Sequence, residues 1–499
     1  MPVFEPADES GHYAHILYIW KQGRLPNLAD PVPTEKGVGY TTYPPLYYFS
    51  LIPLAKLIDA PLESEELLPY HPQKELFKKS VFSVYLHTKD ELFLKWDNLA
   101  WAVHLLRLQT SIYGFLTVYL VYLTGKKMFG EKSRKPLLVV VLVGLNPMFA
   151  HISNSIVNVN LNILLFSLFF YLAVGSFVSR RETKLNFILG LIAGAAYLTK
   201  ITGLMLIPIW VVFIAIYFYR FRVRPGMTLK STLVFAIGFI LTAGWYLVRN
   251  FRLYGNLLET DAAIKHFGRP AMQLEMSGPI NYWTGFVQTN FKTFFSGYGM
   301  LTVNLPDKII YLLTLAAIIG VWGSTFSKKE NPIRSLLKGS SLIILLGHIF
   351  VNINVEAFHA RDLFIGMVPF SLLFVDGVSI WLKELRSGKL WSSRIINSVA
   401  FSIFLTISLF HFLQSDLVDF VKSVLSEFRI FSPVTVKLAG FTLIFYTLWL
   451  VFRRFSQKIA EAIVKVSSDK NFLLNVAVNL FLANILILIL LVIPKLYQL

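Results

Sequence analysis

Residues 201–219 read ITGLMLIPIWVVFIAIYFY, an apolar run without a charged side chain, and Arg220 follows it directly. A run of about 20 apolar residues is long enough to cross the hydrocarbon core of a bilayer as a helix. Similar runs recur near 103–124, 136–152, 156–178, 186–200, 231–248, 306–326, 339–356, 362–382, 395–413, 432–452 and 472–493. We therefore expect an all-α polytopic membrane protein with a bundle of about 12 transmembrane helices.

The composition of the 499-residue chain supports this prediction, because 55% of its residues are hydrophobic and only 15% are charged. A soluble domain is about one-quarter charged. The chain has no cysteine, which excludes disulfides, thiolate metal sites and cysteine nucleophiles. Its net charge of +18 is better explained by loops facing anionic cytoplasmic lipid than by nucleic acid, which we do not expect as a partner.

The basic residues fall in alternate loops, which predicts the orientation of the helices. Six basic loops surround residues 126–135, 180–184, 220–230, 328–338, 383–394 and 453–470. We expect these loops in the cytoplasm, in a multi-pass protein of the cell (inner) membrane. The connections between them then face outward.

We divide this single membrane domain into four segments. Residues 1–102 form a first extracytoplasmic loop with an acidic motif and surface helices, one of them near Leu46 to Ile58. Residues 103–248 form a transmembrane core, 249–305 a second large extracytoplasmic loop, and 306–499 the C-terminal transmembrane helices. Because an outward loop must be carried across the membrane, we expect either a further helix upstream of Met1 or translocation opened by the first span.

The first loop opens with two adjacent carboxylates, Asp8 and Glu9, followed by His12. A carboxylate beside apolar surface can act as a general base. The same residues also fit a helix N-terminus, with Asp8 as the N-cap and Glu9 in the first turn. The spacing leaves both interpretations open.

Several short motifs, taken in order, resemble the GT-C glycosyltransferases, in the branch of aminoarabinose transferases and protein O-mannosyltransferases. In the first loop these are Asp8-Glu9-x-x-His12, Gly23-Arg24-Leu25-Pro26 and Tyr43-Pro44-Pro45-Leu46-Tyr47-Tyr48. Later ones are Asn146-Pro147-Met148-Phe149, Asn158-Val159-Asn160, Leu198-Thr199-Lys200-Ile201-Thr202-Gly203, Trp245-Tyr246-Leu247-Val248-Arg249-Asn250 and His359-Ala360-Arg361-Asp362. Two positions depart from the family pattern: Asn160 stands for the usual Asp, and Ala360 for Gly.

The resemblance implies transfer of a sugar from a polyprenyl-phosphate carrier to a glycan, lipid or protein acceptor at the extracytoplasmic face, with inversion. Asp8 is then the candidate base, Glu9 the second candidate, and His12 a hydrogen-bond partner of the pair. Cations that would stabilise the leaving phosphate are Lys200, Arg249, Arg361 and Arg269. Snorkelling, or local pairing such as Arg361 with Asp362, is the alternative for these cations. Tyr43 and Tyr47 would stack on sugar or lipid, or belong to an interfacial belt.

No cofactor is expected, but a divalent metal stays open, with Asp8, Glu9, His12, His15 and His359 as potential ligands. Their spacing matches no specific metal motif. The competing class is a transporter or a flippase for lipid-linked glycans, which would place charges at the bilayer midplane within symmetric repeats. The polar motifs instead cluster at the outer ends of the spans, which favours an enzyme at the lipid–water boundary.

Overall fold

The computed structural model describes residues 2–6, 8–27, 30, 43–61, 98–179, 183–222, 225–258, 285–298, 305, 307–326, 331–354 and 359–386. Its helices are α1 (Glu9–Gln22), α2 (Leu46–Leu57), α3 (Asn98–Phe129), α4 (Lys135–Gly144), α5 (Pro147–Ser153), α6 (Val159–Ser179), α7 (Thr183–Tyr197), α8 (Leu206–Phe221), α9 (Pro225–Tyr254), α12 (Asp307–Gly323), α13 (Pro332–Asn354) and α14 (Met367–Arg386). Residues 285–295 are also helical. Three short 3₁₀ helices, η4 (Ile201–Met205), η5 (Ser324–Phe326) and η6 (Ala360–Gly366), precede or follow longer ones.

Among the described residues, five helices are long and apolar enough to cross a membrane: Val159–Val178, Ile201–Phe221, Gly226–Tyr254, Pro332–Asn352 and Ala360–Lys383. The expectation of an all-α polytopic membrane protein is confirmed. The total of about 12 helices and the four-segment division stay predictions, because the spans expected at 395–413, 432–452 and 472–493 lie outside the described residues.

The span expected at 136–152 is broken in the structure. Helices α4 and α5 meet at an angle of 67°. The break follows from the sequence Asn146-Pro147, because proline supplies no N–H and restricts the residue before it to extended conformations. Asn146 is indeed extended, at φ −67° and ψ 115°, and its side chain caps α5 by accepting a hydrogen bond from the N–H of Phe149.

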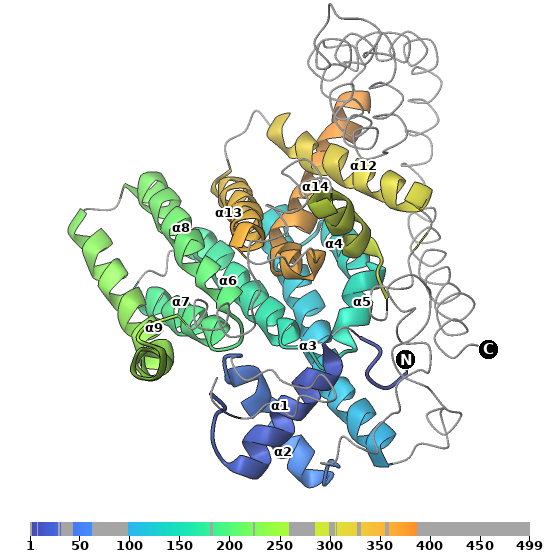
Figure 1. The fold of residues 1–499 in the computed structure, drawn as a ribbon. Coiled ribbons are helices and arrows are strands. Elements are labelled where there is room, and N and C mark those ends of the chain that lie inside the picture. Colours follow the sequence, from blue (N-terminus) through green and yellow to red (C-terminus); the bar gives the residue numbers. More distant parts are fainter. Residues whose placement is uncertain are drawn as a thin grey trace, which may run out of the picture.

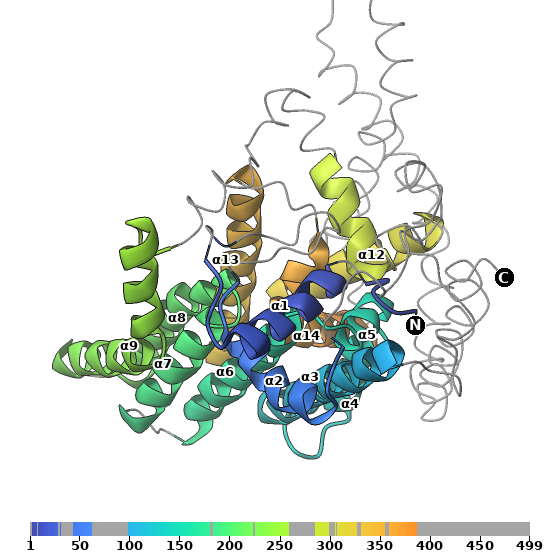
Figure 2. The same cartoon turned by 60° about the horizontal axis from the view of Figure 1, so that its bottom comes forward.

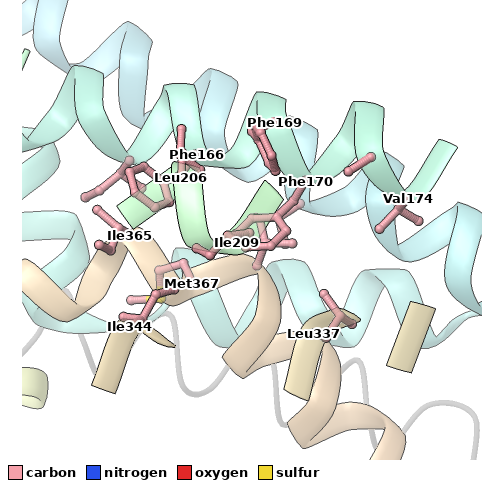
Figure 3. Packing of buried hydrophobic residues seen from close by; sticks show 14 of the residues in the cluster. Phe166, Phe169, Phe170, Val174, Leu206, Ile209, Leu337, Ile344, Ile365 and Met367 are labelled. Carbon is pink, nitrogen blue, oxygen red and sulfur yellow. The ribbon is translucent and has the colours of Figure 1, made fainter. Parts of the chain in front are cut away.

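The main hydrophobic core lies between α6, α8, α13 and α14 (Figure 3). Phe166, Phe169 and Phe170 of α6 pack there against Leu206 and Ile209 of α8. Ile344 of α13, Ile365 of η6 and Met367 of α14 complete the same cluster. This packing holds η4 and η6, which begin α8 and α14, in a fixed position at one end of the bundle.

Helices α1 and α2 lie across that end (Figures 1 and 2). They pack on each other and on the first turns of α3, through a second cluster that includes Phe4, Tyr13, Tyr48, Leu51 and Leu106. The N–H of Leu46 donates to the carbonyl of Leu198 (2.8 Å), which joins the start of α2 to the loop before η4. The first loop is thereby attached directly to the segment that contains Lys200.

Candidate functional site

The site begins where α1 begins. Asp8 occupies the N-cap position in a left-handed conformation, with φ 67° and ψ 2°, and its side chain makes no capping hydrogen bond. Such a conformation is uncommon for a residue other than glycine, although aspartate tolerates it better than most. The carboxylate of Asp8 instead forms an ion pair with the guanidinium of Arg361 in η6, and it stays 26% exposed. Asp8 therefore occupies the expected N-cap position, but its carboxylate binds Arg361 instead of capping the helix.

Glu9, the next residue, has the opposite environment because its side chain is fully buried. Its carboxylate accepts hydrogen bonds from Nε and Nη2 of Arg107, at 2.9 and 2.5 Å. The N–H groups of Ile156 (2.9 Å) and Phe4 (3.1 Å) also donate to it. Four donors on two oxygens leave this carboxylate saturated, so it joins α1, α3 and the segment before α6.

A second ion pair lies beside the first. The ammonium of Lys200, the residue before η4, contacts the carboxylate of Asp362, the neighbour of Arg361. Arg361 and Asp362 thus point to different partners, rather than pairing locally with each other. The side chains of Lys200 and Asp362 are 15% and 14% exposed, so the paired charges are partly open to water.

These two ion pairs bring three distant segments to one place, with two cations and two carboxylates. A buried or half-buried charge is costly unless it is paired, and here each charge has a counter-charge. An anionic ligand is attracted to such a site only by displacing a carboxylate from its cation. The arrangement therefore suits a phosphate ligand that competes with Asp8 and Asp362 for Arg361 and Lys200.

A wall of aromatic rings lines the α1 side of the site. Nδ1 of His12 lies 2.7 Å from the hydroxyl of Tyr48, and the imidazole stacks on Tyr43 at a centroid distance of 5.1 Å. Burial lowers the pKa of His12 to about 3, and the nearby charge of Asp8 opposes this shift only in part. His12 is therefore neutral at physiological pH. Tyr47 is fully buried, and among the described residues its hydroxyl has no hydrogen-bond partner.

Of the remaining predicted cations, Arg249 forms other contacts and Arg269 lies outside the described residues. Arg249 of α9 donates from Nη2 to the carbonyl of Pro26 (2.6 Å), and its guanidinium lies 5.7 Å from the ring centroid of Tyr246. It ties α9 to the Gly-x-Leu-Pro motif of the first loop. Within the part of the chain that the structure describes, no group of three or more metal-ligating side chains occurs.

Arg107 is the site residue that the sequence analysis missed. It lies inside the apolar run 103–124, and an ionisable residue within a span marks a function or a buried partner. That rule would have drawn attention to Arg107. Its partner Glu9 is 98 residues away, however, and no local pattern connects the two.

Comparison with known proteins supports the expected resemblance. Residues 97–246 match the family model described as "Dolichyl-phosphate-mannose-protein mannosyltransferase". The chain resembles the GT-C glycosyltransferases. The matched segment runs from α3 to α9, so it contains Arg107 and Lys200 but neither Asp8 nor Arg361. The family resemblance therefore covers the part of the bundle against which the first loop packs.

Among solved structures, this GT-C-like chain is similar to the crystal structure of ArnT from Cupriavidus metallidurans bound to undecaprenyl phosphate. The two sequences are 12% identical, and the alignment covers 90% of this chain and 73% of the other, with a TM-score of 0.44. No curated protein sequence matches.

Proposed function

We propose that this protein is an inverting glycosyltransferase that moves a sugar from a polyprenyl-phosphate carrier to an acceptor hydroxyl at the extracytoplasmic face of the cell membrane. The single observation that carries the proposal is the pairing of Asp8 with Arg361 beside the pairing of Lys200 with Asp362. A base and two phosphate-binding cations are what such a transfer requires. The matched family's description names a dolichyl-phosphate donor, which supports a polyprenyl-phosphate carrier here.

In the proposed reaction, Asp8 takes the proton of the acceptor hydroxyl while the hydroxyl oxygen bonds to the anomeric carbon. The bond between that carbon and the phosphate oxygen breaks, and its electron pair stays on the leaving lipid phosphate. Arg361 and Lys200 stabilise the negative charge that this phosphate gains. Tyr43, which is partly exposed and stacks on the buried ring of His12, provides a ring on which a sugar can stack.

Donor binding and activation of the base are linked in this scheme. Before the donor binds, Arg361 holds the carboxylate of Asp8 in an ion pair. The donor phosphate is a phosphodiester with one negative charge shared by two oxygens, so it can bind the guanidinium in the same two-pronged way as a carboxylate and compete with Asp8 for it. When it draws Arg361 away, the ionised Asp8 is released to accept the acceptor's proton. Glu9 does not take part, because its oxygens are occupied by Arg107 and two backbone N–H groups.

The basic loops support the orientation in this proposal. Lys126 and Lys127 lie in the last turn of α3, at the end away from Arg107. Arg220 lies in the last turn of α8, and Lys200 precedes η4 at the other end of that helix. If these cations face the cytoplasm, the Asp8–Arg361 pair faces outward. The donor's lipid chain would then lie in the outer leaflet, and its phosphate would reach the site at the lipid–water boundary.

The test is sugar transfer by purified protein from a panel of polyprenyl-phosphate sugars. Asp8→Asn should lower kcat by about 100- to 10,000-fold, the usual contribution of a general base. Asp59→Asn, at an exposed position after α2, is the matched control and should transfer at the wild-type rate. Full activity of Asp8→Asn would overturn the assignment. Flux of a lipid-linked sugar across sealed vesicles without any transfer product would favour the transporter class instead.

A further inference from the structure

A second group of charges lies at the opposite end of the bundle from Asp8. Helices α3 and α13 run between the two ends: Arg107 of α3 contacts Glu9, while Lys127 lies in the last turn of the same helix. At the far end, the first turns of α13 and the middle of α14 come together, and α4 packs beside α14 (Figure 1). None of the residues there takes part in the proposed transfer.

The centre of this group is an ion pair between Arg334 of α13 and Asp376 of α14. Nε of Arg334 lies 2.6 Å from Oδ2 of Asp376, and Nη2 lies 3.2 Å from Oδ1. Both side chains are largely buried, at 13% and 9% exposure. Two further cations, Lys135 of α4 and Lys338 of α13, lie close enough to experience the charges of both Asp376 and Arg334.

The helices meet closely at this point. A Cβ atom placed on Gly125 of α3 would lie 3.2 Å from Cβ of Pro136 and 3.5 Å from Cδ2 of Leu372. Pro136 follows Lys135 directly, and Leu372 lies one turn before Asp376 on α14. The cations are therefore held at a junction of helices, half-buried, rather than on a solvated loop.

Among the described residues, the charges at this junction do not balance. Three described cations, Lys135, Arg334 and Lys338, lie near one described carboxylate, that of Asp376, whereas two cations meet two carboxylates at the Asp8 end. Among the described residues, neither Lys135 nor Lys338 lies within ion-pair distance of a carboxylate, and Lys135 instead lies 5.3 Å from the ring centroid of Phe129. Half-buried cations in excess of their counter-charges create a site for an anion.

We propose that Lys135, Arg334 and Lys338 bind the phosphate of an anionic phospholipid headgroup. The cations lie at one end of apolar helices, at the depth where a headgroup would lie if the acyl chains pack along α4, α13 and α14. Lys135 and Lys338 supply the charge that the Arg334–Asp376 pair does not neutralise. The lipid would stabilise the packing of α4 and α14 against α13, at the end of the bundle opposite the proposed transfer site.

The experiment measures binding of anionic lipid to the full-length protein in nanodiscs or detergent by native mass spectrometry. The probe is phosphatidylglycerol, with phosphatidylcholine as the neutral reference. The paired variant Lys135→Gln/Lys338→Gln should bind phosphatidylglycerol about 10-fold more weakly or worse, because each basic residue near an anionic lipid contributes about a fivefold factor. Lys132→Gln/Arg134→Gln removes the same charge from exposed neighbours and is the matched control.

Unchanged affinity in Lys135→Gln/Lys338→Gln would overturn the proposal, and so would the same loss in the control pair, which would show only general surface attraction. Displacement of the lipid by millimolar inorganic phosphate would show a free-phosphate site instead. If the glutamine variant is poorly folded, lipid binding is measured instead on Lys135→Arg/Lys338→Arg. This variant keeps both charges and should retain the preference for phosphatidylglycerol over phosphatidylcholine. Loss of that preference would also count against the proposal.

Discussion

The carboxylate of Asp8 and the guanidinium of Arg361 form an ion pair although 353 positions separate them in the sequence. The pair joins the first residue of the α1 region to the 3₁₀ turn that begins α14. It places a carboxylate that is 26% exposed beside a cation that can also bind a phosphate. We expect the function of both residues to depend on this contact.

Arg361→Gln should lower kcat for sugar transfer by about 100- to 1,000-fold, as loss of one donor to a developing negative charge does elsewhere. Arg361→Lys should recover part of the rate, because an ammonium keeps the charge but loses the two-pronged geometry. Steady-state kinetics with varied donor should also show a raised KM for the donor in both variants. Arg252→Gln, an exposed arginine near the end of α9, is the control. An unchanged KM and kcat in Arg361→Gln would contradict the phosphate-binding role.

Glu9→Gln should act on stability rather than on chemistry. The substitution leaves Arg107 buried without its counter-charge, and breaking one member of a buried pair costs about 3–5 kcal/mol. We therefore expect a Tm several degrees lower for Glu9→Gln, and a similar loss for Arg107→Met. The double variant should recover part of that loss, because neither charge is then left alone. A normal Tm combined with complete loss of transfer would instead make Glu9 a participant in the reaction.

Gly203→Ala should displace Lys200. A Cβ atom on Gly203 would lie 2.1 Å from the carbonyl carbon of Ala196 and 2.3 Å from the N atom of Tyr197, and neither backbone atom can give way without moving α7. Overpacking of this kind costs about 1–3 kcal/mol. We expect a lowered Tm together with a raised donor KM, measured on the same preparation. Gly226→Ala, where a Cβ atom meets nothing within 4 Å, should leave both quantities unchanged.

His12 should make the protein less stable in acid. Its pKa is about 3 in the folded protein and 6.5 in the unfolded chain, because burial disfavours the charged ring. Between these values the unfolded chain binds the extra proton, so stability is full above about pH 6.5 and falls as the pH is lowered towards 3. His12→Gln should therefore show a shallower fall in Tm between pH 7 and pH 5 than the wild type. Parallel Tm curves for the two proteins would count against this prediction.

Much of the fold follows from local sequence. The apolar run 201–219 is η4 and α8, and the run 156–178 is α6, because a helix that spans a bilayer satisfies its own backbone. The apolar run 136–152 predicted a single span. The break within it follows from Pro147 and from the capping side chain of Asn146, which are both local features of the sequence.

The sequence predicted which residues belong to the candidate site, but it did not predict which of them contact one another. Lys200 is conspicuous because it is a charge between two apolar runs, and Asp8 because it precedes Glu9 at the start of a helix. Nothing local shows that Lys200 meets Asp362 or that Glu9 meets Arg107, since side chains 162 and 98 positions apart are joined only by tertiary packing. The same holds for Arg334 and Asp376. Distinguishing the two adjacent carboxylates therefore required the structure.

The distance along the chain between Asp8 and Arg361 also has a consequence in time. Ribosomes add about 5–20 residues per second, so Asp8 leaves the ribosome roughly 20–70 s before Arg361 does. Throughout that interval the nascent chain holds Asp8 without Arg361, its ion-pair partner. Under the proposed function, an incomplete chain in the membrane would therefore not consume lipid-linked sugar, and the first turnover would wait until α14 has entered the bilayer.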